Sequence, residues 1–347
     1  MYLDSHRLIA QLTGLDDATD LMQPVCKPCN DPDEVLPKVF AELPPDVPLM
    51  YKSTNIDIAD TQSVTLAVGK YPADREQIIE VSYENYHAKP WPWCKIAHIR
   101  NGLAAAAEHG LAGWLCLPVN MGNDDRTIDP DVGGLGRMNT SLLKKVLDGD
   151  DRTDAELVAE WVAEQFGSPQ PAEAVEVLPE ADALVSDGLY WDRGIPNRAP
   201  FASLHTTKLY WMFDGFADPA FPYRMADPSA ETLEQIIATK HAAADKARAA
   251  IAKVHAARAA MRLDLHHELT ESLTMLADAV LLARDWHSYL AVQYGIEHGV
   301  FPADRVTLGR MIRYGETFIR NLLKLADAPA GKWARSRMSF PDAFGLS

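Results

Sequence analysis

The sequence predicts an α/β fold in which part of a (β/α)8 TIM barrel is followed by an all-α C-terminal region. Three short apolar runs alternate with two helical patterns: the runs cover 48–51, 78–83 and 112–119, and the helical patterns cover 33–43 and 93–109. This alternation is typical of parallel β/α units, and later residues have mainly helical spacing. We therefore expect the C-terminal half of a TIM-barrel-like domain in residues 1–150 and a helical C-terminal domain in residues 151–347.

The first elements are predicted from apolar spacing and from the residues that end them. The helix at 33–43 ends at Pro44-Pro45, just before the strand that begins near Leu49. The helix at 93–109 has one apolar side, and Gly110 is placed to end it. A strand follows directly, so helices and strands succeed each other through short loops.

The C-terminal helices have recognisable start signals. Thr153 and Glu156 form a capping box, which opens a helix that ends before Gly167. Three further helices are predicted: one from Asp227-Pro228 to about Arg262, one from Leu263 to Gly299, and one after Pro302. Structure rather than chemistry explains these signals.

Composition limits the partners of this chain. Its 347 residues carry 49 acidic and 33 basic side chains, a formal net charge of −16. This charge disfavours nucleic acid and anionic membranes as partners. No apolar stretch is long enough to span a membrane and no signal peptide is visible, so we expect a cytoplasmic protein. Four scattered cysteines agree with that compartment.

Polar residues follow two of the predicted strands. Lys52 and Asp57 come after the first of these strands, and Glu84 comes after the second. A buried strand of an α/β barrel can offer side chains to a ligand only where it leaves the core, at its carboxyl end. We therefore expect a site built on the carboxylates of Asp57 and Glu84. Arg137, in the glycine-rich loop further on, is a candidate anion contact.

Each of these residues also has a plain structural interpretation. Without its neighbours in sequence, Asp57 would be typical of a turn, and Glu84 would be typical of a solvated or helix-capping position. Lys52 could form an ion pair with Asp57 and lower the pKa of that acid. Trp91 and Trp93 could stack on sugar faces, whereas we expect Trp114 in the core.

Metal and cofactor sites are not predicted. Cys26 and Cys29 form a CxxC pair, which is half a zinc site, and the remaining cysteines lie in a predicted helix and a predicted strand. His266 and His267 are adjacent on a helix and point about 100° apart, so they cannot both face one ion. No phosphate-binding glycine motif is present, and we expect no cofactor.

Three separated stretches resemble the C-terminal part of the α-glucuronidases of glycoside hydrolase family 67. The segment from Lys52 to Asp57 is similar to that family's strand-end motif, in which a lysine precedes an Ile-Asp pair, and Tyr83-Glu84-Asn85-Tyr86 is close to the spacing of its Gln-Glu-Tyr segment. Residues 139–161 are similar to a family segment that ends in a capped helix. The late segments 231–236 and 283–286 are similar to the family's helical C-terminal domain.

The resemblance implies a barrel enzyme that removes 4-O-methyl-glucuronic acid from xylan-derived oligosaccharides with inversion. Asp57 and Glu84 would hold the attacking water, and Lys52 would contact the uronate carboxylate. An inverting glycosidase needs its two carboxyl groups about 6.5–9.5 Å apart to leave room for that water. The expected partner is thus an oligosaccharide substrate.

Two classes of function stay open at this point. The family's general-acid glutamate and its substrate-binding arginine lie upstream of the matched region, and this chain starts too late to contain that acid, so we assign no general acid. The chain is then either a working glycoside hydrolase or an incomplete carbohydrate-binding or scaffold fragment of one. Homodimerisation and export are not determined by the sequence.

Overall fold

The structure is a computed structural model that describes residues 10–12, 47–52, 76–80, 92, 94, 96–115, 138–167, 170–189 and 229–326. The chain forms two compact units. The first comprises Met1–Asn85 and Lys95–Met121, and the second comprises Tyr86–Cys94 and Gly122–Ser347.

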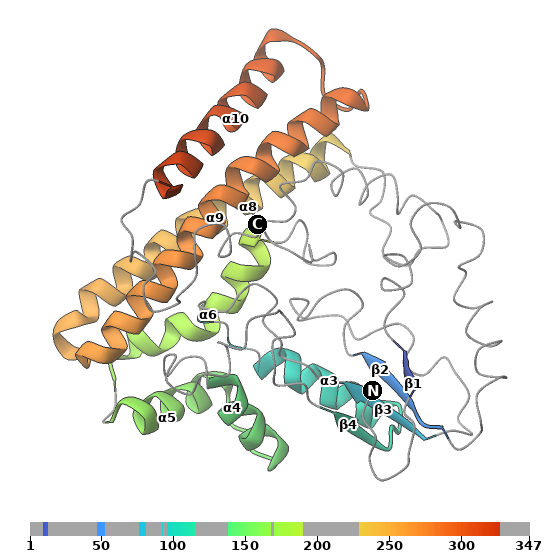
Figure 1. Cartoon of the computed structure of the whole chain (residues 1–347), viewed down its shortest axis with the longest axis vertical. Helices are drawn as coiled ribbons and strands as arrows, with labels where there is room; N and C mark the ends of the chain where they lie inside the picture. The colour runs from blue at the N-terminus through green and yellow to red at the C-terminus, as the bar shows by residue number, and fades with distance from the viewer. Residues whose placement is uncertain are drawn as a thin grey trace. The chain divides into compact units, whose positions relative to one another are not determined.

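The first unit contains a parallel sheet (Figure 1). Its strands are β1 (Ala10–Leu12), β2 (Leu49–Lys52), β3 (Gln77–Glu80) and β4 (Gly113–Leu115). Their order in the sheet is β1-β2-β3-β4, and every neighbouring pair is parallel. The expected parallel α/β arrangement is therefore confirmed, and the four described strands form an open sheet rather than a closed barrel. β1 lies upstream of the three predicted strands.

Helix α3 (Ile96–Glu108) connects β3 to β4 and packs against both strands. Ile96 and Ile99 are completely buried on its inner side. The helix ends where the sequence predicts, because Gly110 adopts a positive φ of 63° that residues with a side chain rarely accept. The amide of Leu111 donates to the carbonyl oxygen of Ala106 at 2.9 Å and closes the last turn.

The middle of the sheet is covered on both faces. Successive residues of a strand point to opposite faces, and Leu49 and Met50 of β2 are both buried, as is Ile79 of β3. Burial on both faces is the usual condition of a parallel sheet, and it explains why these strands read as continuous apolar runs.

The second unit is helical. Its elements are α4 (Met138–Leu147), α5 (Asp154–Phe166), α6 (Ala172–Leu189), α8 (Ala230–Ala257), a short 3-10 turn η6 (Arg258–Ala260), α9 (Leu263–Glu297) and α10 (Arg305–Ala326). α8 packs along α9, α6 packs against both of them, and α10 packs against α9 (Figure 1). The all-α C-terminal region predicted from the sequence is confirmed for the described residues.

Small side chains allow the long helices to approach closely. α8 contributes Ala243, Ala244 and Ala247 to its contact face, all nearly fully buried. Gly188 of α6 lies against α9, where an added Cβ would come within 2.5 Å of Cγ2 of Val280. α6 can therefore reach α9 only because position 188 has no side chain.

Some element boundaries differ from those predicted. The N-cap of α8 is Ser229, whose hydroxyl accepts from the amide of Thr232 at 3.1 Å, so the start predicted at Asp227-Pro228 is two residues too early. Helix α6 was not predicted, and it contains Pro179, a residue that ordinarily signals a helix end. Helix α4 belongs to the second of the two compact units. Among the described helices, none has the length and apolar character needed to span a bilayer.

Candidate functional site

The register of β2 and β3 places the predicted site residues in relation to one another. Lys52 is the last residue of β2, and its Cα pairs with that of Glu80, the last residue of β3. Because the two strands are parallel and end in register, the chain leaves both of them at the same edge of the sheet. The two strands that precede Asp57 and Glu84 in the sequence therefore lie side by side and parallel.

Three of the four predicted site residues lie outside the described part of the chain. Asp57, Glu84 and Arg137 are in this group, and for Lys52 the structure describes the backbone alone. Asp57 comes five residues after the end of β2, and Glu84 comes four residues after the end of β3. The two carboxylates thus follow a matched pair of strand ends at nearly equal distances along the chain.

Trp114 is not a core residue, contrary to the prediction. Its side chain is 42% exposed, although its register partner Ile79 on β3 is completely buried. β4 is the last strand in the described order, so within the part of the chain that the structure describes it has a neighbouring strand on one side only. Trp91 and Trp93 lie outside the described residues.

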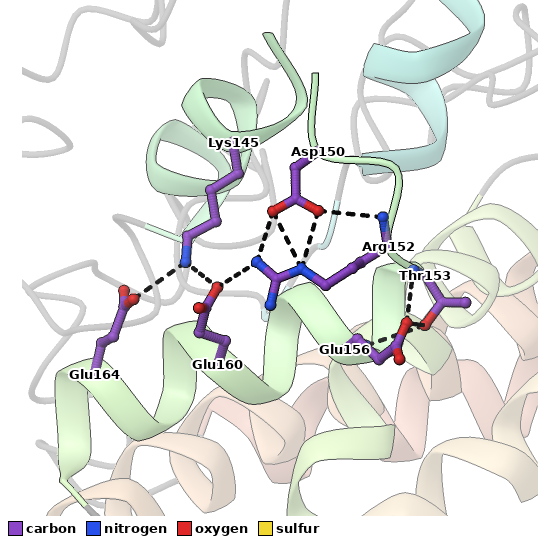
Figure 2. A network of polar contacts seen from close by, with 7 residues as sticks. All are labelled: Lys145, Asp150, Arg152, Thr153, Glu156, Glu160 and Glu164. Atoms are coloured by element: carbon purple, nitrogen blue, oxygen red, sulfur yellow. Dashed lines mark hydrogen bonds and ion pairs between the residues drawn. The ribbon is translucent and has the colours of Figure 1, made fainter. Parts of the chain in front are cut away.

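In the helical unit, a group of ion pairs joins α4 to α5 (Figure 2). Lys145 of α4 pairs with Glu160 and, at 3.1 Å, with Glu164, both on α5. Arg152 pairs through Nη2 with Asp150 at 2.6 Å and with Glu160 at 2.9 Å. Glu160 therefore forms ion pairs with both Lys145 and Arg152 and lies at the centre of the group.

These ion pairs favour the charged forms of Asp150 and Glu160. Hydrogen bonds from Arg152 lower the pKa of Asp150 to about 2. The pKa of Glu160 is also lowered, mainly by its hydrogen bond with Lys145 and secondly by that with Arg152. Burial opposes ionisation of Lys145, but the hydrogen bonds to Glu160 and Glu164 raise its pKa overall. A general acid or base must exchange its proton near neutral pH, so the pairing indicates a structural role for this group.

The predicted capping box is present beside these ion pairs. The Thr153 hydroxyl accepts from the Glu156 amide at 3.3 Å, and the Glu156 carboxylate accepts from the Thr153 amide at 2.9 Å (Figure 2). The box starts α5 and fixes the turn that carries Arg152.

A second polar group is buried where α6, α8 and α9 meet. Lys240 is 1% exposed, and its ammonium group donates to the backbone carbonyl oxygen of Asp187 at 2.7 Å. The Asp187 carboxylate lies 3.7 Å from the ammonium group of Lys246. His287 is equally buried. Its pKa lies well below the usual value, mainly because of burial and secondly because of the charge of Lys240.

A third polar group connects α9 to α10. The Asp285 carboxylate is 1% exposed, accepts from Nδ2 of Asn321 at 2.8 Å and pairs with Arg284 at 2.6 Å. Burial raises the pKa of Asp285, while Arg284 opposes that shift. The pKa of the neighbouring His241 is lowered, first by burial and then by Arg284.

These buried charges were missed in the sequence, although a signal exists. Lys240 lies three residues after Ile237 and three before Ala243, so it belongs to the apolar stripe of α8. Asp285 likewise lies three residues after Leu282 and three before Ser288, both buried on α9. A charge inside an apolar stripe of helical period indicates a buried, paired side chain.

The described residues contain no group of three or more histidines, cysteines or acids able to hold a metal ion. His266 is buried and His267 is exposed, so the two rings do not share one environment. Cys26, Cys29 and Cys116 lie outside the described residues, and Cys94 is buried.

No family model matches this chain, and no curated protein is significantly similar to it. The family resemblance therefore stays a prediction, which rests on the three stretches of sequence that carry it.

Proposed function

We propose that this chain is a glycoside hydrolase that resembles the α-glucuronidases and cleaves the uronic-acid bond of a xylan-derived oligosaccharide with inversion. The observation that carries this proposal is the register of β2 and β3. Lys52 and Glu80 are paired at the ends of the two strands. Asp57 and Glu84 follow these ends by five and four residues, a spacing suited to two carboxylates that act on one substrate.

In this proposal, β1 to β4 and α3 are β/α units of a (β/α)8 barrel. Three features support it: the strands are all parallel, they lie in chain order, and a helix links β3 to β4. Barrels of this kind carry their catalytic groups at the carboxyl ends of the strands. That is the edge at which Lys52 lies.

Asp57 and Glu84 hold the attacking water between them. One of the two ionised carboxylates accepts a proton as the water oxygen bonds to the anomeric carbon, while the bond to the leaving oxygen breaks on the opposite face. Lys52, with Arg137, binds the uronate carboxylate and distinguishes an acidic sugar from a neutral one. The leaving oxygen needs a proton, and the family resemblance assigns no donor for it within this chain.

The test uses two substrates, an aldouronic acid and an aryl glucuronoside, with the wild-type chain and the variants Asp57→Asn and Glu84→Gln. Removal of a general base typically lowers the rate about 10²–10⁴-fold, and both variants should fall in that range. Glu76→Gln is the matched control, because Glu76 is an exposed residue at the opposite, amino end of β3. It should leave the rate unchanged.

The two substrates separate the roles of base and acid. An aryl group departs as a stable anion and needs little protonation, so the aryl glucuronoside should react much faster than the natural substrate. Near-wild-type turnover by Glu84→Gln would contradict the assignment of the carboxylates. Tight binding of the aldouronic acid by calorimetry with no turnover of either substrate would instead establish a carbohydrate-binding fragment.

A further inference from the structure

Helix α10 has two apolar faces, and among the described residues of the second unit one of them packs against other helices while the other does not. Phe318 and Leu325 are buried, and the Phe318 ring lies 5.1 Å from that of Trp286 on α9. The other face is exposed. It consists of Leu308 (39% exposed), Ile312 (53%), Ile319 (56%) and Leu323 (57%), called the outer stripe below.

The outer stripe has the spacing of a helix contact face. Its members follow one another at intervals of four, seven and four residues, so they form a single row along α10. At 1.5 Å per residue the row is about 22 Å long, which is the length of four turns of a partner helix. Exposed aliphatic side chains that form a continuous row mark an interaction site more often than scattered ones do.

A basic rim runs along one side of the outer stripe. Arg313, Arg320 and Lys324 are exposed and follow one another at intervals of seven and four residues. No carboxylate in the described part of the chain forms an ion pair with any of the three, whereas Arg310 on the inner side pairs with Glu234 at 2.6 Å.

The rim gives α10 a charge opposite to that of the whole protein. α10 contains five basic residues and one acid, Glu316, which amounts to +4, while the chain has a net charge of −16. Such a local concentration of positive charge beside an apolar row favours an apolar partner with acidic flanks.

We propose that the outer stripe and the basic rim together form a docking site for an acidic amphipathic helix of a partner protein. The Leu and Ile side chains of the outer stripe contact the partner's apolar face, as in other complexes where a helix lies along an apolar surface. The basic rim forms ion pairs with glutamates or aspartates on one flank of the partner helix. These pairs determine which helix binds and in which orientation.

Other occupants fit the charges less well. Two copies of α10 packed antiparallel through their outer stripes would bring basic rim against basic rim, and like charges repel. An anionic membrane would attract the rim but repel a protein of net charge −16. The acidic helix satisfies both the apolar row and the rim.

The probe for the test is a synthetic, fluorescently labelled 22-residue helix with leucine at its a and d positions and glutamate at the flanking positions. A matched probe carries lysine in place of each glutamate. Fluorescence anisotropy with the full chain should show the glutamate probe binding about 10-fold tighter than the lysine probe, with an affinity that falls as salt screens the rim.

Variants of α10 distinguish apolar from charged contributions. Ile312→Ser combined with Ile319→Ser should weaken binding of the glutamate probe by about 10-fold or more, because both anchors are lost. Arg320→Glu should also weaken it, and Glu316→Lys should strengthen it. Val306→Ser is the matched control, since Val306 is an exposed apolar residue of α10 outside the outer stripe.

Four outcomes would overturn the proposal. These are equal affinity for the two probes, full affinity after loss of both isoleucines, preferential binding to phosphatidylserine vesicles through the outer stripe, and a concentration-dependent dimer in sedimentation that Ile319→Ser abolishes. The substituted side chains are exposed, so the helical content measured by circular dichroism should be unchanged and loss of binding will not reflect unfolding.

Discussion

The buried ammonium group of Lys240 on α8 donates a hydrogen bond of 2.7 Å to the backbone carbonyl oxygen of Asp187 on α6. α6 ends at Leu189, so this oxygen is one of the last four carbonyls of the helix. Lys240 thus satisfies the C-terminal end of α6 with a positive charge, which the helix dipole favours. This contact fixes α6 on α8.

Removal of Lys240 should therefore destabilise the helical unit. We expect Lys240→Ala to lower the free energy of unfolding by about 2–4 kcal/mol, because it leaves a cavity and a buried carbonyl without its donor. Lys240→Met should cost less, since it restores the volume and buries no charge. Urea unfolding followed by circular dichroism measures both. Lys246→Ala is the control, since Lys246 is largely exposed on the same helix, and a loss as large as that of Lys240→Ala would contradict this explanation.

Two glycine substitutions should change stability in opposite directions. Gly188→Ala places a Cβ 2.5 Å from Cγ2 of Val280, a stiff β-branched neighbour, and should cost about 1–3 kcal/mol. Gly309→Ala on α10 meets only the flexible Arg313 side chain at 3.6 Å and should stabilise by about 0.5–1 kcal/mol through helix propensity. Thermal unfolding of both variants tests the difference. The double variant Gly188→Ala with Val280→Ala should recover part of the loss, and no recovery would place the strain elsewhere.

The helical unit should lose stability in mild acid. His241, His266 and His287 all have lowered pKa values, in each case first because of burial. In the unfolded chain these groups bind protons below about pH 6.5, whereas in the folded chain they bind them only at lower pH. The stability is thus fully present above pH 6.5 and is lost as the pH falls from there toward the folded pKa values.

His287 provides the clearest check of this pH dependence. Replacing it with leucine should reduce the slope of unfolding free energy against pH by up to about 1.4 kcal/mol per pH unit below pH 6.5. His267→Gln is the matched control, because the His267 side chain is exposed in the folded protein. Unfolding curves collected between pH 5 and 7 measure the slope, and an unchanged slope for His287→Leu would contradict the prediction.

Lys52 provides a test of substrate charge. If Lys52 binds the uronate carboxylate, Lys52→Ala should weaken binding of uronate sugars by at least about 10-fold and leave their neutral analogues almost unaffected, since a carboxylate without its cation keeps its desolvation cost. Calorimetric titration with an aldouronic acid and its neutral xylose counterpart gives the comparison. Equal losses for the two sugars would mean that Lys52 is structural.

The sequence alone determined the local structure of this protein. The apolar periodicities and the Thr153–Glu156 capping box predicted α3, α5 and α9 near their observed bounds, because helix formation and its end signals depend on residues within a few positions of each other. The alternation of strands and helices likewise predicted a parallel sheet, since parallel neighbours require a crossover.

Only the tertiary structure decided which distant residues meet. Lys52 and Glu80 lie opposite each other in the sheet because of the register of two strands. The hydrogen bond from Lys240 to Asp187 depends on the packing of α6 against α8. Helix α6 forms despite Pro179, because burial of its apolar face outweighs a local signal. Trp114 is 42% exposed although its register partner Ile79 is completely buried, a difference that depends on how the sheet is packed and that no short stretch of sequence contains.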